Sequence, residues 1–187
     1  EIKLNQLVSQ VDYRGDGVDV YTQKGRFHAD YVIVTVPLGV LKADVIKFIP
    51  GLPKKKRNAI KQLGMGVYDK IILHFDYAFW DLDKEWMGPM PNPGHQDEIL
   101  QIMNLGKFTH QPDLLIFTAG SYAKQVEKWS DEKILQVSMN MLRKLYGNDI
   151  PEPVDYMITR WNSDPYSLGS YSYLPKNVKY NVFRRLA

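Results

Sequence analysis

Cysteine is absent from the 187-residue chain, which excludes a disulfide framework and a thiolate metal site. The sequence also lacks an apolar run approaching the roughly 20 residues that a membrane-spanning helix needs, and it shows no signal peptide. Its four histidines are scattered without the spacing of metal ligands: His28, His74, His95 and His110. We therefore expect no bound metal and no membrane partner, and we favour a cytoplasmic location while the compartment stays unknown.

A strong charge of one sign is missing as well, because the formal net charge is only +3. The basic run at residues 54–57 has no interleaved aromatic residues, so it fits a solvated helix face better than a nucleic-acid site. A hydrophobic content of 44% argues against disorder. These features predict a globular chain without a nucleic-acid partner.

Residues 1–36 have the pattern of paired strands. Two segments with alternating apolar residues flank the turn sequence Gly15-Asp16-Gly17, which predicts a β-hairpin. The β-branched run at residues 31–36 is bounded by Pro37. A continuous apolar run of this length predicts a strand buried on both faces.

Three helical segments are expected. Residues 38–42 fit one helical turn, and a short helix follows Pro53 with Gly64 as its C-cap. A longer helix begins after Ser130, carries acidic residues in its first turn and ends at Gly147.

The remaining strands are expected at 67–75, 98–105, 114–118 and 154–158, with a loop rich in proline and glycine at 88–94. In the strand expected at 67–75, successive side chains point to opposite faces of the sheet and so form two sets of residues. One set is Val67, Asp69, Ile71, Leu73 and Phe75, and the other is Tyr68, Lys70, Ile72 and His74. Strands and helices without regular βαβ alternation predict an α+β fold.

Aromatic residues gather in the segment RWNSDPYSLGSYSY at residues 160–173, interleaved with proline, glycine and serine. Such a segment makes a poor helix and a poor regular strand. Its rings offer rigid apolar faces for a flat ligand, or they close a core. From these residues alone, both alternatives stay open.

Together with three other passages, this segment resembles the flavin-dependent amine oxidases, which include polyamine oxidases, monoamine oxidases and flavin-type histone demethylases. The passages are KLNQLVSQVDY at 3–13, ADYVIVTVPLGVLK at 29–42 and LGMGVYDKIILHFDYAFW at 63–80. They occur in the order in which the family has them. The family's strand–GxGxxG–helix unit, which holds a pyrophosphate, has no counterpart here, so we expect the chain to be a central fragment of a longer enzyme.

The resemblance implies three segments with distinct roles. Residues 1–43 resemble part of an FAD-binding domain, 44–158 an inserted substrate-binding domain with a mixed β-sheet backed by helices, and 159–187 a partial return into the FAD-binding domain. The expected fold is therefore an α+β substrate domain flanked by strands of an incomplete FAD-binding domain.

Lys70 is the main catalytic candidate. From periodicity, a lysine in an apolar strand is more often an edge residue whose ammonium reaches water. The resemblance favours a functional role for Lys70 instead, because the family's lysine at this place holds a water against the flavin. It also implies that Tyr171 forms one wall of an aromatic cage for the amine. His74 shares the face of Lys70 and is either a substrate-binding residue or a packed histidine.

Five residues are expected near the cofactor. The resemblance places Val8 at the adenine, Pro37 in the scaffold, and Trp161 and Tyr166 against the flavin ring or its pocket. Ser170 stands where some family members attach the flavin through a cysteine. Because cysteine is absent, FAD in the longer parent would be bound noncovalently.

The expected function follows from the resemblance: oxidation of a small-molecule amine to an imine by hydride transfer to FAD, with O2 regenerating the flavin and giving H2O2. The fragment alone is expected to be inactive. Two alternatives stay open. One is a truncated binding or assembly module that self-associates through exposed strand edges, and the other is a related flavoprotein of different chemistry.

Overall fold

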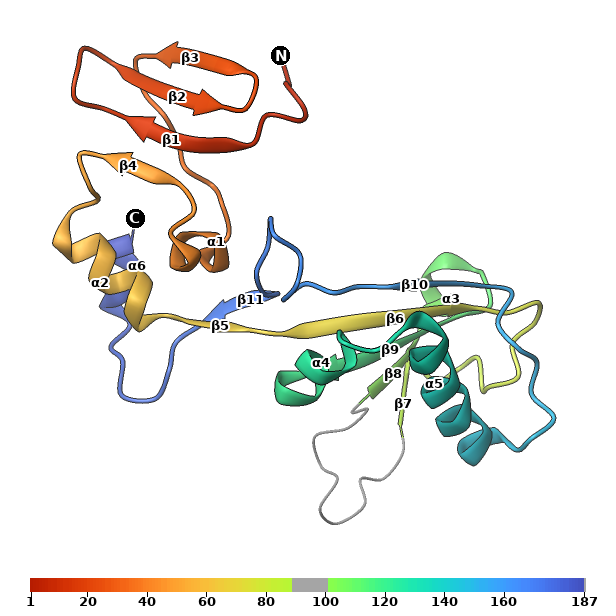
Figure 1. The fold of residues 1–187 in the computed structure, drawn as a ribbon. Coiled ribbons are helices and arrows are strands. Elements are labelled where there is room, and N and C mark those ends of the chain that lie inside the picture. The colour runs from red at the N-terminus through yellow and green to blue at the C-terminus, as the bar shows by residue number, and fades with distance from the viewer. Residues whose placement is uncertain (89–100, 187) are drawn as a thin grey trace. The chain divides into compact units, whose positions relative to one another are not determined.

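The computed structural model describes residues 1–88 and 101–186, which fold into two compact units (Figure 1). Unit 1 comprises Glu1–Met65 and Pro165–Ala187, and unit 2 comprises Gly66–Asp164. The chain thus leaves unit 1, builds unit 2 and returns. The domain boundaries expected after residues 43 and 158 stay a prediction, because compactness alone assigns neither cofactor nor substrate to a unit.

Unit 1 contains a four-stranded sheet of β1 (Val8–Asp12), β2 (Val18–Thr22), β3 (Gly25–Ala29) and β4 (Lys47–Ile49), in the order β3-β2-β1-β4. The first three strands are antiparallel, and β4 lies parallel to β1. The predicted hairpin of β1 and β2 is confirmed. Its turn contains Gly17 at φ +78°, where an added Cβ would meet the carbonyl oxygen of Ala29 at 2.7 Å, so a glycine is needed there.

The strand predicted at residues 31–36, buried on both faces, is wrong. The segment has no strand structure, and Tyr31 and Ile33 are 89% and 88% exposed. A β-branched run favours a strand only when a neighbouring strand supplies hydrogen bonds and apolar contacts. Within the described residues no strand pairs with this segment, so Tyr31, Ile33 and Val34 stay exposed, and Val36 at its end packs partly against the small core of unit 1.

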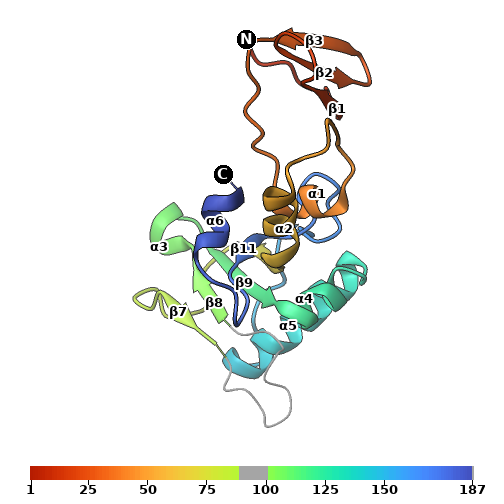
Figure 2. The same cartoon turned by 90° about the vertical axis from the view of Figure 1, so that its left-hand side faces the viewer.

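The helices of unit 1 are α1 (Leu38–Ala43), α2 (Lys54–Gln62) and α6 (Asn181–Leu186), and α2 packs against both others (Figure 2). The expected helical turn and short helix are therefore confirmed. The predicted C-cap Gly64 is wrong, since α2 ends at Gln62 and its C-cap is Leu63, which has an extended backbone. Gly64 instead begins β5 (Gly64–Gly66), which pairs with β11 (Tyr171–Tyr173).

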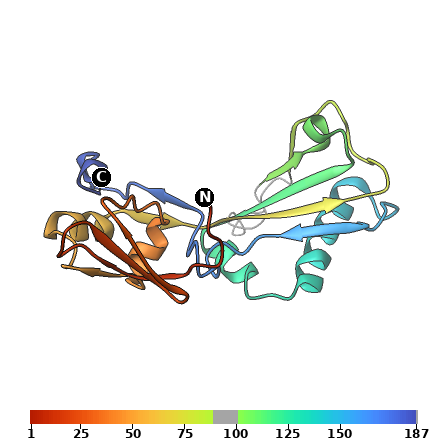
Figure 3. The ribbon, with the colours of Figure 1, turned by 90° about the horizontal axis from the view of Figure 1, so that it is seen from above.

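Unit 2 is built on a five-stranded antiparallel sheet in the order β10-β6-β9-β8-β7. The strands are β6 (Tyr68–His74), β7 (Trp86–Met87), β8 (Gln101–Asn104), β9 (Asp113–Ala119) and β10 (Asp155–Ile158). Figure 3 shows β10 running beside β6 in the opposite direction. The strands expected at 67–75, 114–118 and 154–158 are confirmed; most of the loop at 88–94 and the start of the strand at 98–105 lie outside the described residues.

One face of this sheet packs against α5 (Asp131–Tyr146), and the short helices α3 (Gly106–Thr109) and α4 (Gly120–Val126) complete the unit. The predicted caps of α5 are confirmed, because the Ser130 hydroxyl accepts from the Lys133 amide and Gly147 is the C-cap. Its apolar side joins one buried core with the sheet: Ile71, Leu73, Phe75, Trp80, Ile102, Leu114, Ile116, Val126, Ile134, Met139 and Leu142.

The α+β fold class is confirmed by these mixed sheets and helices. Among the described residues, every helix is too short or too polar to cross a lipid bilayer.

Candidate functional site

Strand β6 presents Lys70 on the face of the sheet opposite to the core. Asp69, Ile71 and Leu73 are 2%, 2% and 0% exposed, whereas Lys70 and His74 between and beyond them are half-buried. The predicted alternation of this strand is therefore confirmed. Its cause is the two-residue repeat of an extended strand of which one face is covered by α5.

The face that carries Lys70 is rich in aromatic rings. Lys70 lies opposite Phe117 of β9 in the strand register. The ring of Phe117 stacks on Tyr68 at 4.8 Å between centroids and on Trp86 at 5.9 Å. We call the set Tyr68, Lys70, His74, Trp86 and Phe117 the lysine face.

At one end of the lysine face, His74 is hydrogen-bonded to Asp113. Its Nδ1 lies 2.7 Å from Oδ1 of Asp113, which is its register partner on β9. The ammonium of Lys70, by contrast, makes no hydrogen bond or ion pair with another described residue. Because no described residue pairs with it, this half-buried ammonium is available for a ligand or a water.

Behind the lysine face, a pair of carboxyl groups anchors the segment that leads to Trp161. Oδ1 of Asp69 accepts from the Trp161 amide at 2.9 Å and from the Thr159 hydroxyl at 3.2 Å. Burial raises the pKa of Asp69 to about 6. The hydrogen bond from the Trp161 amide acts to lower this pKa, whereas the neighbouring Glu127 carboxyl acts to raise it.

Glu127 follows α4 and holds the next two residues of the same segment. Its Oε1 accepts from the Asn162 amide at 2.7 Å, and its Oε2 accepts from the Ser163 hydroxyl at 2.5 Å. Burial acts to raise the pKa of Glu127, but the hydrogen bonds from Ser163 and Asn162 outweigh it and leave the pKa below its ordinary value.

The aromatic turn at 166–173 belongs to unit 1. Its bend combines Leu168 at φ +51° with Gly169 at φ +133°, and the bend lies directly on α1. An added Cβ at Gly39 would meet the carbonyl oxygens of Leu168 and Ser167 at 2.3 and 2.5 Å. This close approach requires glycine at position 39 and fixes the turn on the helix.

Within this turn the candidate rings are open to solvent. Tyr166 is 65% exposed and Tyr171 is 51% exposed, and the ring of Tyr171 lies 6.3 Å from that of Tyr173. Ser170, between them, is half-buried. The rings are accessible, so this turn is open to a ligand.

Val8 and Pro37 lie in unit 1 as well. Val8 packs with Leu168 of the turn against the small core of Val11, Val40 and Ile46. Pro37 precedes α1 as its N-cap without a side-chain cap bond. The structure thus gathers Val8, Pro37, Tyr166, Ser170 and Tyr171 in unit 1, and Lys70, His74 and Trp161 in unit 2.

Comparison with known proteins decides the family. A family model described as "Flavin containing amine oxidoreductase" matches residues 1–187. The chain belongs to this family.

Relatives of this flavin amine oxidase chain include plant enzymes. Polyamine oxidase 4 of Oryza sativa subsp. japonica is 44% identical over 176 residues, covering 92% of the chain and 35% of the relative. Polyamine oxidase 2 of Arabidopsis thaliana is 38% identical over 187 residues, covering 100% of the chain and 37% of the relative. The chain therefore spans about a third of the length of these relatives.

A histone demethylase and a solved structure extend the comparison. Lysine-specific histone demethylase 1 homolog 1 of Oryza sativa subsp. japonica is 38% identical over 173 residues, covering 90% of the chain and 20% of the relative. A double mutant of putrescine oxidase has a TM-score of 0.72 at 21% identity, covering 91% of the chain and 37% of that structure. This last likeness concerns the fold.

A flavin amine oxidase needs a flavin, and the described residues fit part of one. The exposed rings of the turn at 166–173 suit the flat ring system. A pyrophosphate is usually held by a glycine-rich loop at a helix N-terminus. The helices α1 and α2 begin after Pro37 and Pro53 and have no such glycine-rich loop at their N-termini. The turn at 166–173 therefore offers a surface for the flavin ring, whereas these two helix starts offer no site for the pyrophosphate.

Four residues of the site escaped the sequence prediction as functional residues. Trp86 and Phe117 belong to the lysine face through strand register, which pairs residues distant in sequence. Asp69 and Glu127 are 58 positions apart and come together because both accept from amides of the segment after β10, a tertiary contact that no local pattern reveals. One signal was available: Asp69 falls on the predicted core face, where an unpaired carboxylate is costly.

Proposed function

We propose that this chain forms part of an FAD-dependent amine oxidase that converts a small-molecule amine, with a polyamine as the favoured substrate class, into an imine. The single observation that carries the proposal is the lysine face, where Lys70 lies opposite Phe117 of the stacked aromatic rings and its ammonium has no hydrogen-bond or ion-pair partner among the described residues. The polyamine oxidases among the relatives support the substrate class.

FAD, bound noncovalently, would supply the redox chemistry by accepting a hydride from the carbon next to the amine nitrogen and passing the electrons to O2 to give H2O2. The imine then hydrolyses to a carbonyl compound and a smaller amine. We assign contact with the cofactor to Val8, Trp161, Tyr166 and Ser170, with Pro37 as scaffold.

The protein's own residues orient the amine and hold water. Rings attract a cationic amine through their π faces, which suits Tyr171 and the aromatic residues of the lysine face. His74, fixed by Asp113, contributes a polar group at the end of that face. Lys70 holds a water beside the reacting atoms. When the side chain of Lys70 is neutral, it also accepts a proton from the substrate amine.

The test uses the protein expressed from its full natural reading frame. Its visible spectrum should show flavin bands that bleach when a polyamine is added without oxygen and return with oxygen. Lys70→Met should slow the return about 100-fold while leaving flavin content unchanged. Lys124→Met, at an exposed lysine of α4, is the matched control and should react as the unaltered protein does.

Other outcomes point elsewhere. Flavin bands that no amine bleaches would favour a related flavoprotein of different chemistry. A colourless product would remove the roles given to Lys70 and Tyr171.

We keep one second candidate, a non-catalytic module that pairs with another copy of itself. The observation that favours it is the exposed apolar segment at 31–36, because such a segment is suited to strand pairing with another chain. Sedimentation of a colourless product as a concentration-dependent dimer would support this module; a monomer would argue against it.

A further inference from the structure

The carboxyl groups of Asp69 and Glu127 accept from the adjacent amides of Trp161 and Asn162, so both groups lie at the same short stretch of chain. Oδ2 of Asp69 is buried and receives no hydrogen bond from another described residue. Two ionised carboxylates only accept, whereas one proton between them turns the contact into a hydrogen bond. A proton shared by the two carboxyl groups would give Oδ2 of Asp69 the hydrogen-bond partner that it lacks among the described residues.

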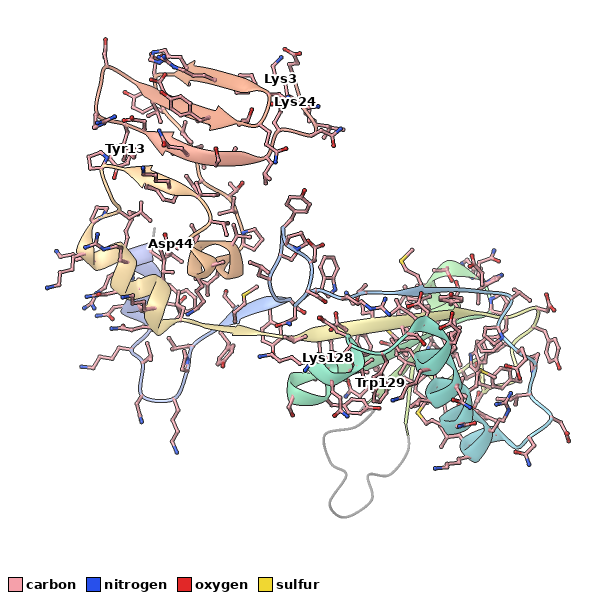
Figure 4. The ribbon with its side chains drawn as sticks, in the orientation of Figure 1. Lys3, Tyr13, Lys24, Asp44, Lys128 and Trp129 are labelled. Carbon is pink, nitrogen blue, oxygen red and sulfur yellow. The ribbon has the colours of Figure 1, made fainter. Side chains whose placement is uncertain are left out.

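This pair binds one short segment of chain from two sides. Asp69, from β6, accepts from Thr159 and from the Trp161 amide. Glu127, at the end of α4, accepts from Asn162 and Ser163. We call residues 159–163 the strap. Figure 4 labels Lys128 and Trp129, which directly follow Glu127 where α4 ends.

The strap in turn fixes the backbone of Lys70. The Lys70 amide donates to the Thr159 hydroxyl oxygen at 2.8 Å, and the Thr159 amide donates to the Lys70 carbonyl at 2.9 Å. The same hydroxyl donates to Asp69. A continuous hydrogen-bond chain thus runs from Asp69 through Thr159 to the residue on the lysine face.

We propose that Asp69 and Glu127 act as a positioning pair, in which one shared proton holds the strap and thereby sets the placement of Lys70 and Trp161. The effect on catalysis rests on the function proposed above. The existence of the pair and of its shared proton does not depend on that function. Without the proton, two negative charges face each other in a buried place, and we expect the strap to loosen.

The surroundings leave the pair without a direct cationic partner among the described residues. Arg160 lies in the strap, but its guanidinium donates to the carbonyl oxygens of Glu127 and Trp129 and to the Asp131 carboxylate of α5. From β9, the neighbour of Asp69 in register is the uncharged Thr118. Lys70 extends on the opposite face of β6. The raised pKa of Asp69 is consistent with this setting.

Hydrogen exchange resolved at individual amides tests the pair in the protein expressed from its natural reading frame. After correction for intrinsic exchange, protection of the Lys70, Trp161 and Asn162 amides should fall on the order of tenfold as the pH rises through about 6. Asp69→Asn should keep these amides protected and remove the pH dependence, because the amide side chain imitates the protonated acid. Glu127→Gln should move the transition to lower pH, since it removes the facing negative charge.

A matched control and two outcomes make the test decisive. Asp113→Asn, at the far end of the same strand pair, should leave exchange of the strap unchanged. Protection that does not vary with pH in the unaltered protein, or that varies equally in Asp69→Asn, would overturn the proposal.

A second measurement separates the pair from the proposed function. If the protein carries flavin, the reoxidation rate should show an inflection near pH 6 that Asp69→Asn removes while the rate at low pH is kept. An unchanged inflection in that variant would overturn the positioning of Lys70. A protein without flavin would defeat the proposed function, and the exchange experiment would still decide on the pair.

Discussion

The buried carboxyl of Asp69 ties the stability of unit 2 to pH. Its pKa is raised by burial from the ordinary 3.8 to about 6. A raised folded-state pKa means that the group stabilises the fold fully below its unfolded pKa and that this contribution is lost as pH rises through the folded value. At 1.36 kcal/mol per unit, the loss between about pH 4 and pH 6 amounts to about 3 kcal/mol. Glu127 acts in the opposite direction, because its lowered pKa stabilises the fold above its unfolded pKa and not below it.

We therefore predict that Asp69→Asn changes the pH profile of unfolding. Relative to the unaltered protein, the variant should gain about 3 kcal/mol of unfolding free energy between pH 4 and pH 7, because it has no carboxylate to bury. Urea unfolding at several pH values measures the difference. A constant difference across that range would contradict the buried-acid assignment.

At the scale of elements, the contact between α1 and the aromatic turn requires a residue without a side chain at position 39. Gly39→Ala would place a Cβ 2.3 Å from the Leu168 carbonyl oxygen, and backbone atoms cannot yield cheaply. We predict a loss of about 1 to 3 kcal/mol of unfolding free energy, the usual range for overpacking. Gly15→Ala is the control, since its added Cβ would meet no atom within 4 Å. Equal stability of the two variants in urea would show that the turn adapts.

The elements differ in how far sequence alone could predict them. Helix α5 and strand β6 were predictable because each carries its own periodicity, and Ser130 and Gly147 mark the helix ends locally. The segment at 31–36 was not, because its propensity needs a partner strand that the described residues do not supply. Gly64 was misjudged for a related reason: the ring of Tyr173, from a distant strand, lies where its Cβ would be.

The candidate site shows the same division. Lys70 and His74 were placed on one face by alternation within a single strand. Trp86 and Phe117 join them only through the registers of β7, β8 and β9, which depend on long-range pairing. Motif resemblance supplied roles for Tyr171 and Ser170, and these roles stay predictions.

At the scale of the whole molecule, each unit has a core made of its own residues. The core of unit 2 is the cluster around Leu73 and Leu142. Unit 1 has two smaller clusters, one around Leu63 and Val182 and one around Val11 and Val40. Separate cores allow separate cooperative transitions, and a single unfolding free energy would then not describe the chain.

The separate cores predict that a core substitution lowers the stability of its own unit and leaves that of the other unit unchanged. Leu142 on α5 is fully buried, so Leu142→Ala should destabilise unit 2 by about 2 to 5 kcal/mol through lost burial and a cavity. Unfolding followed by exchange of amides in each unit should show the loss at 66–164 and not in the β1–β2 hairpin. The exposed Leu82 of the same unit gives the control, and Leu82→Ala should stay within about 0.5 kcal/mol of the unaltered protein. Equal loss of protection in both units after Leu142→Ala would mean that they unfold as one.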